Sequence, residues 1–251
     1  MVNNNLLDAN MNAPIIEINN LVFSYSVTNK KCLDISQLII AKGERVFLYG
    51  PSGSGKSTLL GVLGGVLVAQ QGSVQLLGKK IGQDLTTMKS SARDKFRADH
   101  IGFLFQQFNL IPYLSVFDNV LLPCQFSAKR AANAVATRNT LHQEVERLLL
   151  KLDLQPALFN RPVTQLSVGQ QQRVAAARAL IGKPEIIIAD EPTSALDADR
   201  QAIFLELLLQ ESAASNATLV FVSHDRRLAK TFDREINLSE LNRAVLEAET
   251  A

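Results

Sequence analysis

Hydrophobic and polar positions alternate in the first part of the chain and recur at helical spacing further on. Residues 15–25 and 32–40 alternate in apolar character, which predicts two antiparallel strands joined by a connection at 26–31. Short apolar runs follow, and several are nearly continuous, as in strands buried on both faces. The further predicted strands are 45–49, 73–80, 101–105, 185–189 and 218–222.

Helical patterns separate these strands. The predicted helices are 56 to about 68, 141–152, 168–181 and 197–209. Alternation of strands and helices predicts an α/β fold: a mostly parallel sheet with flanking helices, preceded by an antiparallel β part. The helical stretch from about 107 to 165 interrupts the alternation, so we interpret it as an inserted helical lobe. We therefore expect a flexible polar leader at 1–14 and a single domain over 15–251.

Composition narrows the possible classes of protein. Of 251 residues, 47% are hydrophobic and 20% are charged, which is typical of a globular chain. Lys plus Arg number 26 and Asp plus Glu 24, so the net charge of +2 argues against a nucleic-acid partner. The longest nearly apolar stretch, 59–69, is shorter than the about 20 residues of a membrane span. Two cysteines without CxxC spacing predict free thiols in a cytoplasmic setting.

A glycine-rich segment between a predicted strand and a predicted helix carries the strongest chemical signal. Residues 50–57, GPSGSGKS, fit the pattern GxxxxGK[ST]. Glycines let backbone N–H groups cradle phosphates, and the helix N-terminus adds positive partial charge. Lys56 is predicted to reach the β- and γ-phosphates, and Ser57 to ligate Mg²⁺. The predicted ATP-binding residues here are Gly50, Pro51, Ser52, Gly53, Ser54, Gly55, Lys56, Ser57 and Thr58.

A second signal is the run IIIADE at 186–191, in which a buried strand ends in two carboxylates. Ligands of α/β folds bind at the carboxyl ends of the strands. We predict that Asp190 holds Mg²⁺ and that Glu191 orients or deprotonates the attacking water.

The segment LSVGQQQR at 166–173 decides the family. With it, the chain resembles the ATP-binding cassette (ABC) ATPases over nearly its full length, from about residue 15 to 238. The resemblance implies the P-loop cassette fold and ATP hydrolysis with ATP and Mg²⁺. It also implies that Tyr25 stacks on adenine, that Gln106 contacts the nucleotide and Mg²⁺, that Asp197 belongs to the D-loop, and that His224 is the catalytic switch residue.

The same resemblance implies a head-to-tail dimer with two composite sites. In the family the signature contacts the γ-phosphate of ATP held by the other subunit, and its matching residues here are Ser167, Gly169 and Gln170. Two departures stand out. Val168 replaces a usual glycine, which binding tolerates if its φ stays negative. Residues 237–241 contain no glycine, so the usual closing hairpin is expected to be lost or replaced by a short helix.

Residues 101–112 and 115–123 and the Gln-rich signature resemble the subgroup of macrolide-export, lipoprotein-release and cell-division ABC ATPases. This implies a separate permease with a large extracytoplasmic domain, export or lipid-linked extraction, and a peripheral position on the inner face of the cell membrane. The apolar residues 108–113 are predicted to form an exposed docking patch for that permease. Two alternatives stay open: a soluble scaffold ATPase of the iron–sulfur assembly type, and a chromosome or repair ATPase head, although sustained heptads are absent.

Overall fold

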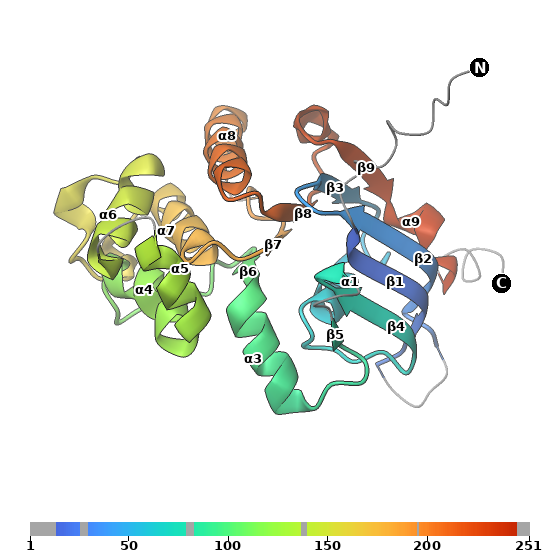
Figure 1. Cartoon of the computed structure of the whole chain (residues 1–251). Coiled ribbons are helices and arrows are strands. Elements are labelled where there is room, and N and C mark those ends of the chain that lie inside the picture. Colours follow the sequence, from blue (N-terminus) through green and yellow to red (C-terminus); the bar gives the residue numbers. More distant parts are fainter. Residues whose placement is uncertain (1–13, 26–29, 79–82, 137–139, 195, 245–251) are drawn as a thin grey trace, which may run out of the picture.

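The computed structural model describes residues 14–25, 30–78, 83–136, 140–194 and 196–244. The predicted leader therefore lies outside these residues except for Pro14, as does most of the connection predicted at 26–31. In the described chain, an antiparallel sheet lies at one end, a group of helices lies at the other, and a parallel sheet reaches between them (Figure 1). None of the described helices has the length and hydropathy of a membrane span.

A five-stranded parallel sheet forms the centre of the molecule. Its strands, in spatial order, are β6 (Ile101–Leu104), β7 (Ile186–Asp190), β8 (Thr218–Val222), β3 (Arg45–Tyr49) and β9 (Arg234–Asn237). Every neighbouring pair is parallel, as the alternation of strands and helices predicts. The strand β9 was not predicted, because its residues are only partly buried or exposed and show no apolar run.

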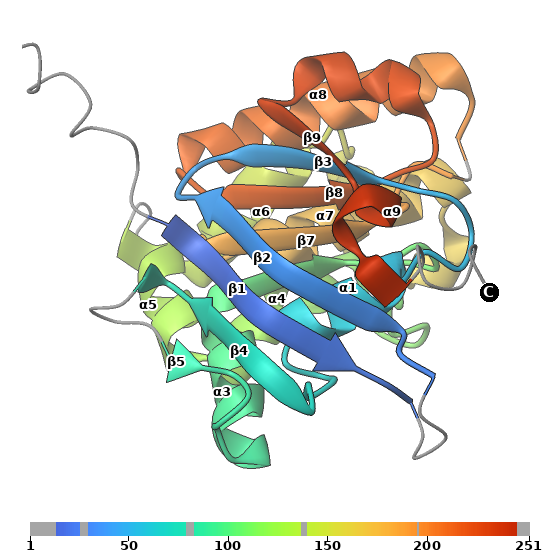
Figure 2. The ribbon, with the colours of Figure 1, turned by 90° about the vertical axis from the view of Figure 1, so that its right-hand side faces the viewer.

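A four-stranded antiparallel sheet covers one side of this centre, which confirms the predicted antiparallel β part (Figure 2). Its strands, in spatial order, are β2 (Leu33–Ala41), β1 (Pro14–Phe23), β4 (Gln71–Leu76) and β5 (Gln83–Asp84). The buried side chains of this sheet share one apolar core with α1 (Lys56–Leu63) and with the facing side of the parallel sheet. The helix α1, which begins with the last two residues of the glycine-rich segment, therefore lies between the two sheets.

The helices differ in length from the sequence expectation at several ends. α1 stops at Leu63 because Gly64 and Gly65 follow it, and Gly65 adopts a φ of 65°. α8 (Ala198–Ala214) runs past the predicted end at 209. α3 (Ser90–His100) was not predicted, because Phe96 is its one buried residue. The short helix α9 (Leu238–Leu241) follows β9 directly, as the missing glycine in 237–241 led us to expect.

Three helices form the lobe on the side away from the antiparallel sheet (Figure 1). They are α4 (Val116–Phe126), α5 (Ala128–Ala136) and α6 (Leu141–Lys151). Side-chain oxygens of Ser115 and Thr140 cap the first turns of α4 and α6. The helix α7 (Val168–Leu180) packs against α4 and joins their shared core to the parallel sheet. The described chain also contains 3₁₀ helices at Pro156–Leu158, Val163–Gln165 and Arg226–Thr231.

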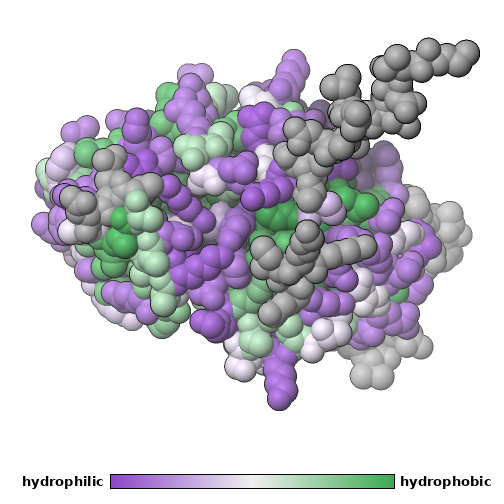
Figure 3. Space-filling view, in the orientation of Figure 1, coloured by the Kyte–Doolittle hydropathy of each residue, from purple (hydrophilic) through white to green (hydrophobic). Residues whose placement is uncertain are grey.

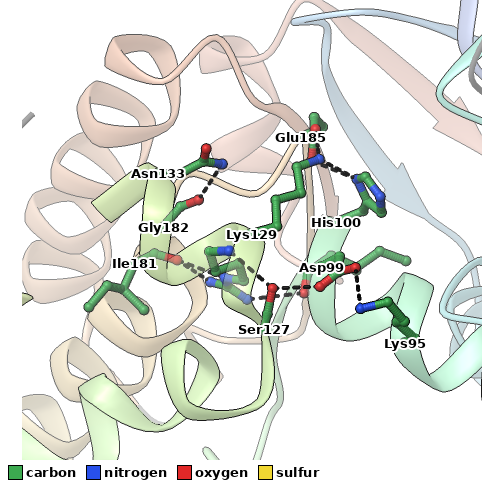
Figure 4. A network of polar contacts seen from close by, with 11 residues as sticks. Lys95, Asp99, His100, Ser127, Lys129, Asn133, Ile181, Gly182 and Glu185 are labelled. Atoms are coloured by element: carbon green, nitrogen blue, oxygen red, sulfur yellow. Dashed lines mark hydrogen bonds and ion pairs between the residues drawn. The ribbon is translucent and has the colours of Figure 1, made fainter. Parts of the chain in front are cut away.

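A polar network ties α5 to α3 and to the residue before β7 (Figure 4). Glu185 accepts hydrogen bonds from Lys129 Nζ at 2.5 Å and lies 3.0 Å from His100 Nδ1. Ser127 Oγ donates to Asp99 at 2.6 Å. Burial raises the pKa of Glu185, but the contacts with His100 and Lys129 outweigh it and lower the pKa to about 2. The lobe is therefore anchored to the central sheet by charged contacts as well as by apolar packing.

Arg130 on α5 is the most deeply buried cation of this anchor. Its side chain donates to the Ile181 carbonyl at 2.8 Å and to the Ala179 carbonyl at 2.7 Å, at the end of α7. Burial lowers its pKa to about 10, so the side chain stays charged at neutral pH. Arg130 thus satisfies carbonyls that the end of a helix leaves without intrahelical partners.

We expect Arg130→Met to lower the free energy of unfolding by about 3 kcal/mol, because buried carbonyls lose charged donors. Lys95→Met is the matched control, because Lys95 forms an ion pair with Asp99 but is itself exposed to solvent. Loss of this pair is expected to lower the free energy of unfolding by less than about 1 kcal/mol. Urea unfolding of both variants measures the difference. Equal losses would contradict the anchoring role of Arg130.

The surface in the orientation of Figure 1 is a mixture of hydrophilic and hydrophobic side chains (Figure 3). Large exposed apolar side chains include Tyr113, Phe126 and Val66. Both cysteines, Cys32 and Cys124, are free thiols, as their spacing predicts.

Candidate functional site

The residues predicted to bind and hydrolyse ATP lie at or just after the carboxyl ends of four neighbouring parallel strands. β3 leads into the glycine-rich loop and β7 ends in Asp190 and Glu191. Gln106 lies two residues after β6, and His224 lies two residues after β8. Because these strands are parallel and adjacent, their carboxyl ends meet at one edge of the sheet. The fold therefore brings together four segments that are far apart in the sequence.

The glycine-rich loop turns through left-handed conformations. Gly53 has a φ of 82° and Gly55 a φ of 96°, which residues with a Cβ rarely adopt. Lys56 Nζ donates to the carbonyls of Gly50 and Pro51, each at 2.9 Å, so its charge lies across the loop. Ser52 is exposed in the same loop. The loop thus carries a cation and backbone N–H groups ahead of the N-terminus of α1, which is the arrangement that binds phosphates.

Asp190 and Ser57 lie next to each other at the start of α1. Burial raises the pKa of Asp190, and a hydrogen bond from Ser57 and the charge of Lys56 act in the opposite direction. Both residues line a cleft of about 650 Å³ that extends along α3 and α4. A hydroxyl and a half-buried carboxylate therefore meet where the loop enters the helix.

Glu191 and His224 form a second pair at the same edge. His224 Nδ1 lies 3.3 Å from Glu191 Oε2, and His224 is exposed. Glu191 has a φ of 43° and its N–H donates to the Val222 carbonyl at 3.0 Å. Such a conformation is unfavourable for a residue with a side chain and is held here by the neighbouring strand β8. The geometry directs a carboxylate and an imidazole into a shared hollow of about 300 Å³.

Tyr25 lies beside α1 at the end of the antiparallel sheet. Its hydroxyl is 3.0 Å from Thr58 Oγ1, and its ring meets Phe23 edge-on at 5.0 Å. The side chain is 67% exposed. A fixed, exposed aromatic ring next to the P-loop helix is a suitable surface for stacking a base.

Gln106 is exposed, but the apolar segment after it differs from the sequence prediction. Phe108 is only 8% exposed and packs in the core of the helical lobe, so the prediction of an exposed patch is wrong at this residue. Phe108 and Asn109 form a turn after β6 with left-handed φ values of 59° and 49°. Arg178 fixes the turn by donating to both of their carbonyls. The exposed apolar residues of the predicted patch are Pro112 and Tyr113, whereas Leu110 and Ile111 are partly buried.

The signature segment begins α7. Ser167 Oγ accepts from the Gln170 N–H at 3.3 Å, and Gln170 Oε1 accepts from the Ser167 N–H at 2.9 Å. This is a capping box, which the Ser-x-x-Gln spacing could have predicted. Val168 is the first helical residue and its φ is not positive, so the condition for tolerating it is met. Ser167, Gly169 and Gln170 line a hollow of about 310 Å³, separate from the cleft of Ser57 and Asp190.

Asp197 caps the N-terminus of α8, where it accepts from the Arg200 N–H at 3.0 Å. The other D-loop residues include Ala195, which lies outside the described residues. Gln201 Nε2 donates to the carbonyls of Thr193 and Leu196 and so fixes this loop from α8. The segment runs between the hollow of Glu191 and the hollow of the signature.

Two residues that the motifs did not single out contact the loops of the site. Gln172 is fully buried, and its Nε2 donates to the Pro192 carbonyl at 2.8 Å, which joins the signature helix to the loop after Glu191. Asn242 is also fully buried and donates to the Ser54 carbonyl at 3.0 Å. No sequence signal pointed to either contact, since both depend on packing between distant elements.

Comparisons with known proteins agree with this geometry. The family described as "ABC transporter" matches residues 33–194. The uncharacterized ABC transporter ATP-binding protein YbbA of Escherichia coli K12 is 42% identical over 204 residues, covering 80% of this chain and 83% of that protein. The macrolide export ATP-binding/permease protein MacB of Pasteurella multocida is 37% identical over 232 residues, covering 92% of this chain and 34% of that longer protein.

Two solved structures of the ATP-binding cassette MJ0796 share the fold. A dimeric post-hydrolysis state bound to ADP and Pi has a TM-score of 0.75 and 33% identity, covering 91% of this chain and 95% of that one. A second dimeric structure, described as a bacterial ABC transporter cassette, has a TM-score of 0.74 and 34% identity, covering 88% and 93%.

Proposed function

The chain belongs to the ABC transporter family and is the ATP-binding, ATP-hydrolysing subunit of an exporter-type transporter. We propose that two copies of the chain close around ATP and so drive a separate membrane permease. We propose further that this work is export or the extraction of a lipid or lipoprotein. The observation that carries the proposal is the convergence of the P-loop, the Asp190–Glu191 pair and His224 at one edge of the parallel sheet.

ATP binding rests on the P-loop and the Tyr25 ring. The loop N–H groups and the N-terminus of α1 bind the phosphates, and Lys56 exchanges its two loop carbonyls for the β- and γ-phosphate oxygens. Ser52 and Thr58 belong to the same cradle, and Thr58 also holds the Tyr25 hydroxyl. The exposed face of Tyr25 stacks on adenine.

Mg²⁺ fits the oxygen donors at the start of α1. Hard divalent cations prefer hydroxyl, carboxylate and amide oxygens. Ser57 and Asp190 supply the first two at the start of α1, and Gln106, which follows β6, is the proposed third donor. Burial raises the pKa of Asp190, and a cation beside this carboxylate would lower it. When bound, Mg²⁺ supplies positive charge against the negative charge of the transferred phosphoryl group.

Glu191 and His224 carry the hydrolytic step. Glu191 accepts a hydrogen bond from water and directs the water oxygen at the γ-phosphorus. His224, 3.3 Å away, orients that carboxylate and senses the γ-phosphate. The backbone contact of Glu191 with β8 links its position to the strand that precedes His224.

The signature completes the site of the second copy. Ser167, Gly169 and Gln170 lie at the N-terminus of α7, where backbone N–H groups favour a phosphate. Their hollow is separate from the cleft of Ser57, which supports contact with ATP held by a partner. Both solved MJ0796 cassettes are described as dimeric, which supports the same arrangement here. Asp197 and its loop lie between the hollow of Glu191 and the hollow of the signature, so in the proposed dimer this loop connects the two composite sites.

A permease is the proposed membrane partner, and it holds the chain on the inner face of the cell membrane. The name of the Pasteurella multocida relative couples an ATP-binding part with a permease. The cleft of about 650 Å³ is lined largely by apolar side chains, among them Phe105, Ile111 and Phe126. It also reaches Ser57 and Asp190, so an inserted permease segment would sense the nucleotide site. A large extracytoplasmic domain on that permease remains part of the proposal.

Pull-down from gently solubilised membranes tests this proposal, with Glu191→Gln and ATP to hold the dimer. We expect a stoichiometric integral-membrane partner, and expect Phe126→Asp, which places a charge in the cleft, to reduce its recovery about tenfold or more. Leu150→Asp is the control, because Leu150 is an exposed apolar residue of the same lobe that does not line the cleft. Recovery of a purely soluble partner would instead favour the scaffold ATPase.

A further inference from the structure

We propose that Asn242 is a positioning residue of the ATP site, whose carboxamide holds the P-loop from behind and sets the direction of its central peptide. The proposal rests on the assignment of residues 50–57 as the phosphate-binding loop. Asn242 belongs to the segment after β9, where this chain has a short helix and lacks the glycine hairpin that is usual in the family.

The side chain of Asn242 uses its full hydrogen-bonding capacity. Nδ2 donates to the Cys32 carbonyl at 2.9 Å and to the Ser54 carbonyl at 3.0 Å. Oδ1 accepts from the N–H groups of Asp34 at 2.7 Å and Ala244 at 3.3 Å. A carboxamide offers two donors and one oxygen with two lone pairs, so all four are used. The buried side chain therefore links the start of β2 to the centre of the P-loop.

Holding the Ser54 carbonyl fixes the next amide of the loop. In a planar trans peptide the C=O and the following N–H point in opposite directions. The Ser54 carbonyl points to Asn242, so the Gly55 N–H points away from it, to the other side of the loop. A Cβ built on Gly55 would lie 2.8 Å from Leu33 Cδ2 and 3.3 Å from Asn242 Nδ2. The loop is thus in close contact with Leu33 and Asn242 at Gly55, the glycine that directly precedes α1.

The helix α9 backs the other end of the loop. Leu238 is fully buried, and its Cβ lies 3.6 Å from a Cβ built on Gly50. The Asn242 N–H donates to the Leu238 carbonyl at 2.8 Å, which sets the side chain at the end of α9. Figure 2 shows α9 after β9, close to the start of β2. One segment, Leu238 to Arg243, therefore supports both Gly50 and Ser54.

Ion pairs of Asp34 hold this segment in place, and we call the Asp34–Arg243 pair the charged latch. Asp34, whose N–H donates to Asn242, is buried and pairs with Arg243 and with Lys31. The hydrogen bond from Lys31 and the pairing with Arg243 lower the pKa of Asp34 although burial opposes them. Asp34 is therefore charged at neutral pH and holds Arg243, the residue next to Asn242.

The test measures ATP binding and ATP turnover of the full chain. We expect Asn242→Ala to raise the Kd of ATP and the KM for ATP about tenfold, because the loop loses its backing hydrogen bond. We expect kcat to change less than about twofold, because Glu191 and His224 lie on other strands. Arg243→Ala, which loosens the latch at an exposed residue, is expected to raise the Kd about two- to threefold.

Asn133→Ala is the matched control, because Asn133 is a part-buried amide that donates to the Gly182 carbonyl, in the helical lobe. We expect it to lower Tm without changing the Kd of ATP. An unchanged Kd in both Asn242→Ala and Arg243→Ala would overturn the inference, as would an equal rise in Asn133→Ala. Absence of ATP binding by the unmodified chain would instead overturn the assignment of the P-loop.

Discussion

Glu191→Gln is expected to lower ATP turnover by about 10³-fold while ATP binding persists. The amide keeps the shape of the carboxylate and its place beside His224, but it no longer accepts the proton of the attacking water. ATP that is bound and not hydrolysed keeps the two subunits together, so the variant is expected to accumulate as a dimer. Phosphate release measures turnover, and size-exclusion chromatography with light scattering measures the dimer.

Glu206→Gln is the control for this experiment. Glu206 is an exposed carboxylate on α8 whose partner is the side chain of Gln210, so its neutralisation is expected to leave turnover within about twofold of the unmodified chain. Unchanged turnover in Glu191→Gln would contradict the role of Glu191 as the general base.

Local sequence patterns were sufficient for short strands whose central residues are buried. The strands 45–49 and 218–222 were predicted with the observed bounds, because continuous apolar runs flanked by turns have few alternatives. The strand β9 and the helix α3 were missed, because each shows little apolar surface to the core. Their structure depends on neighbours that are distant in sequence, such as β3 beside β9.

The candidate site shows the same division. Contiguous motifs identified Lys56, Asp190, Glu191 and His224, and the parallel sheet then explains why they meet. The sequence could not show that Phe108 turns into the core, since that outcome follows from left-handed residues fixed by Arg178. It also could not show Asn242, because an asparagine after a weak strand carries no periodic signal. Contacts between distant segments are therefore the part that required a structure.

The proposed composite site leads to a second prediction with a large effect. Lys56→Ala removes the cation that we propose binds the β- and γ-phosphates, and Ser167→Arg places a bulky side chain at the N-terminus of α7. Each variant alone is expected to lose at least about 100-fold in ATP turnover. Neither change is expected to prevent folding, since Ser167 is exposed and its cap contributes about 1 kcal/mol.

Mixing the two variants in equal amounts is expected to restore up to about one quarter of the unmodified turnover. Random pairing makes about half of the dimers mixed, and in each mixed dimer one site combines an intact P-loop with an intact signature. If the signature of each chain served its own P-loop, every site would carry one substitution and the mixture would stay inactive. The control is a mixture of Lys56→Ala with a chain that carries both substitutions. It is expected to remain inactive, because neither chain then has an intact P-loop. Recovery only in the first mixture requires that Ser167 acts on ATP bound by Lys56 of the other copy.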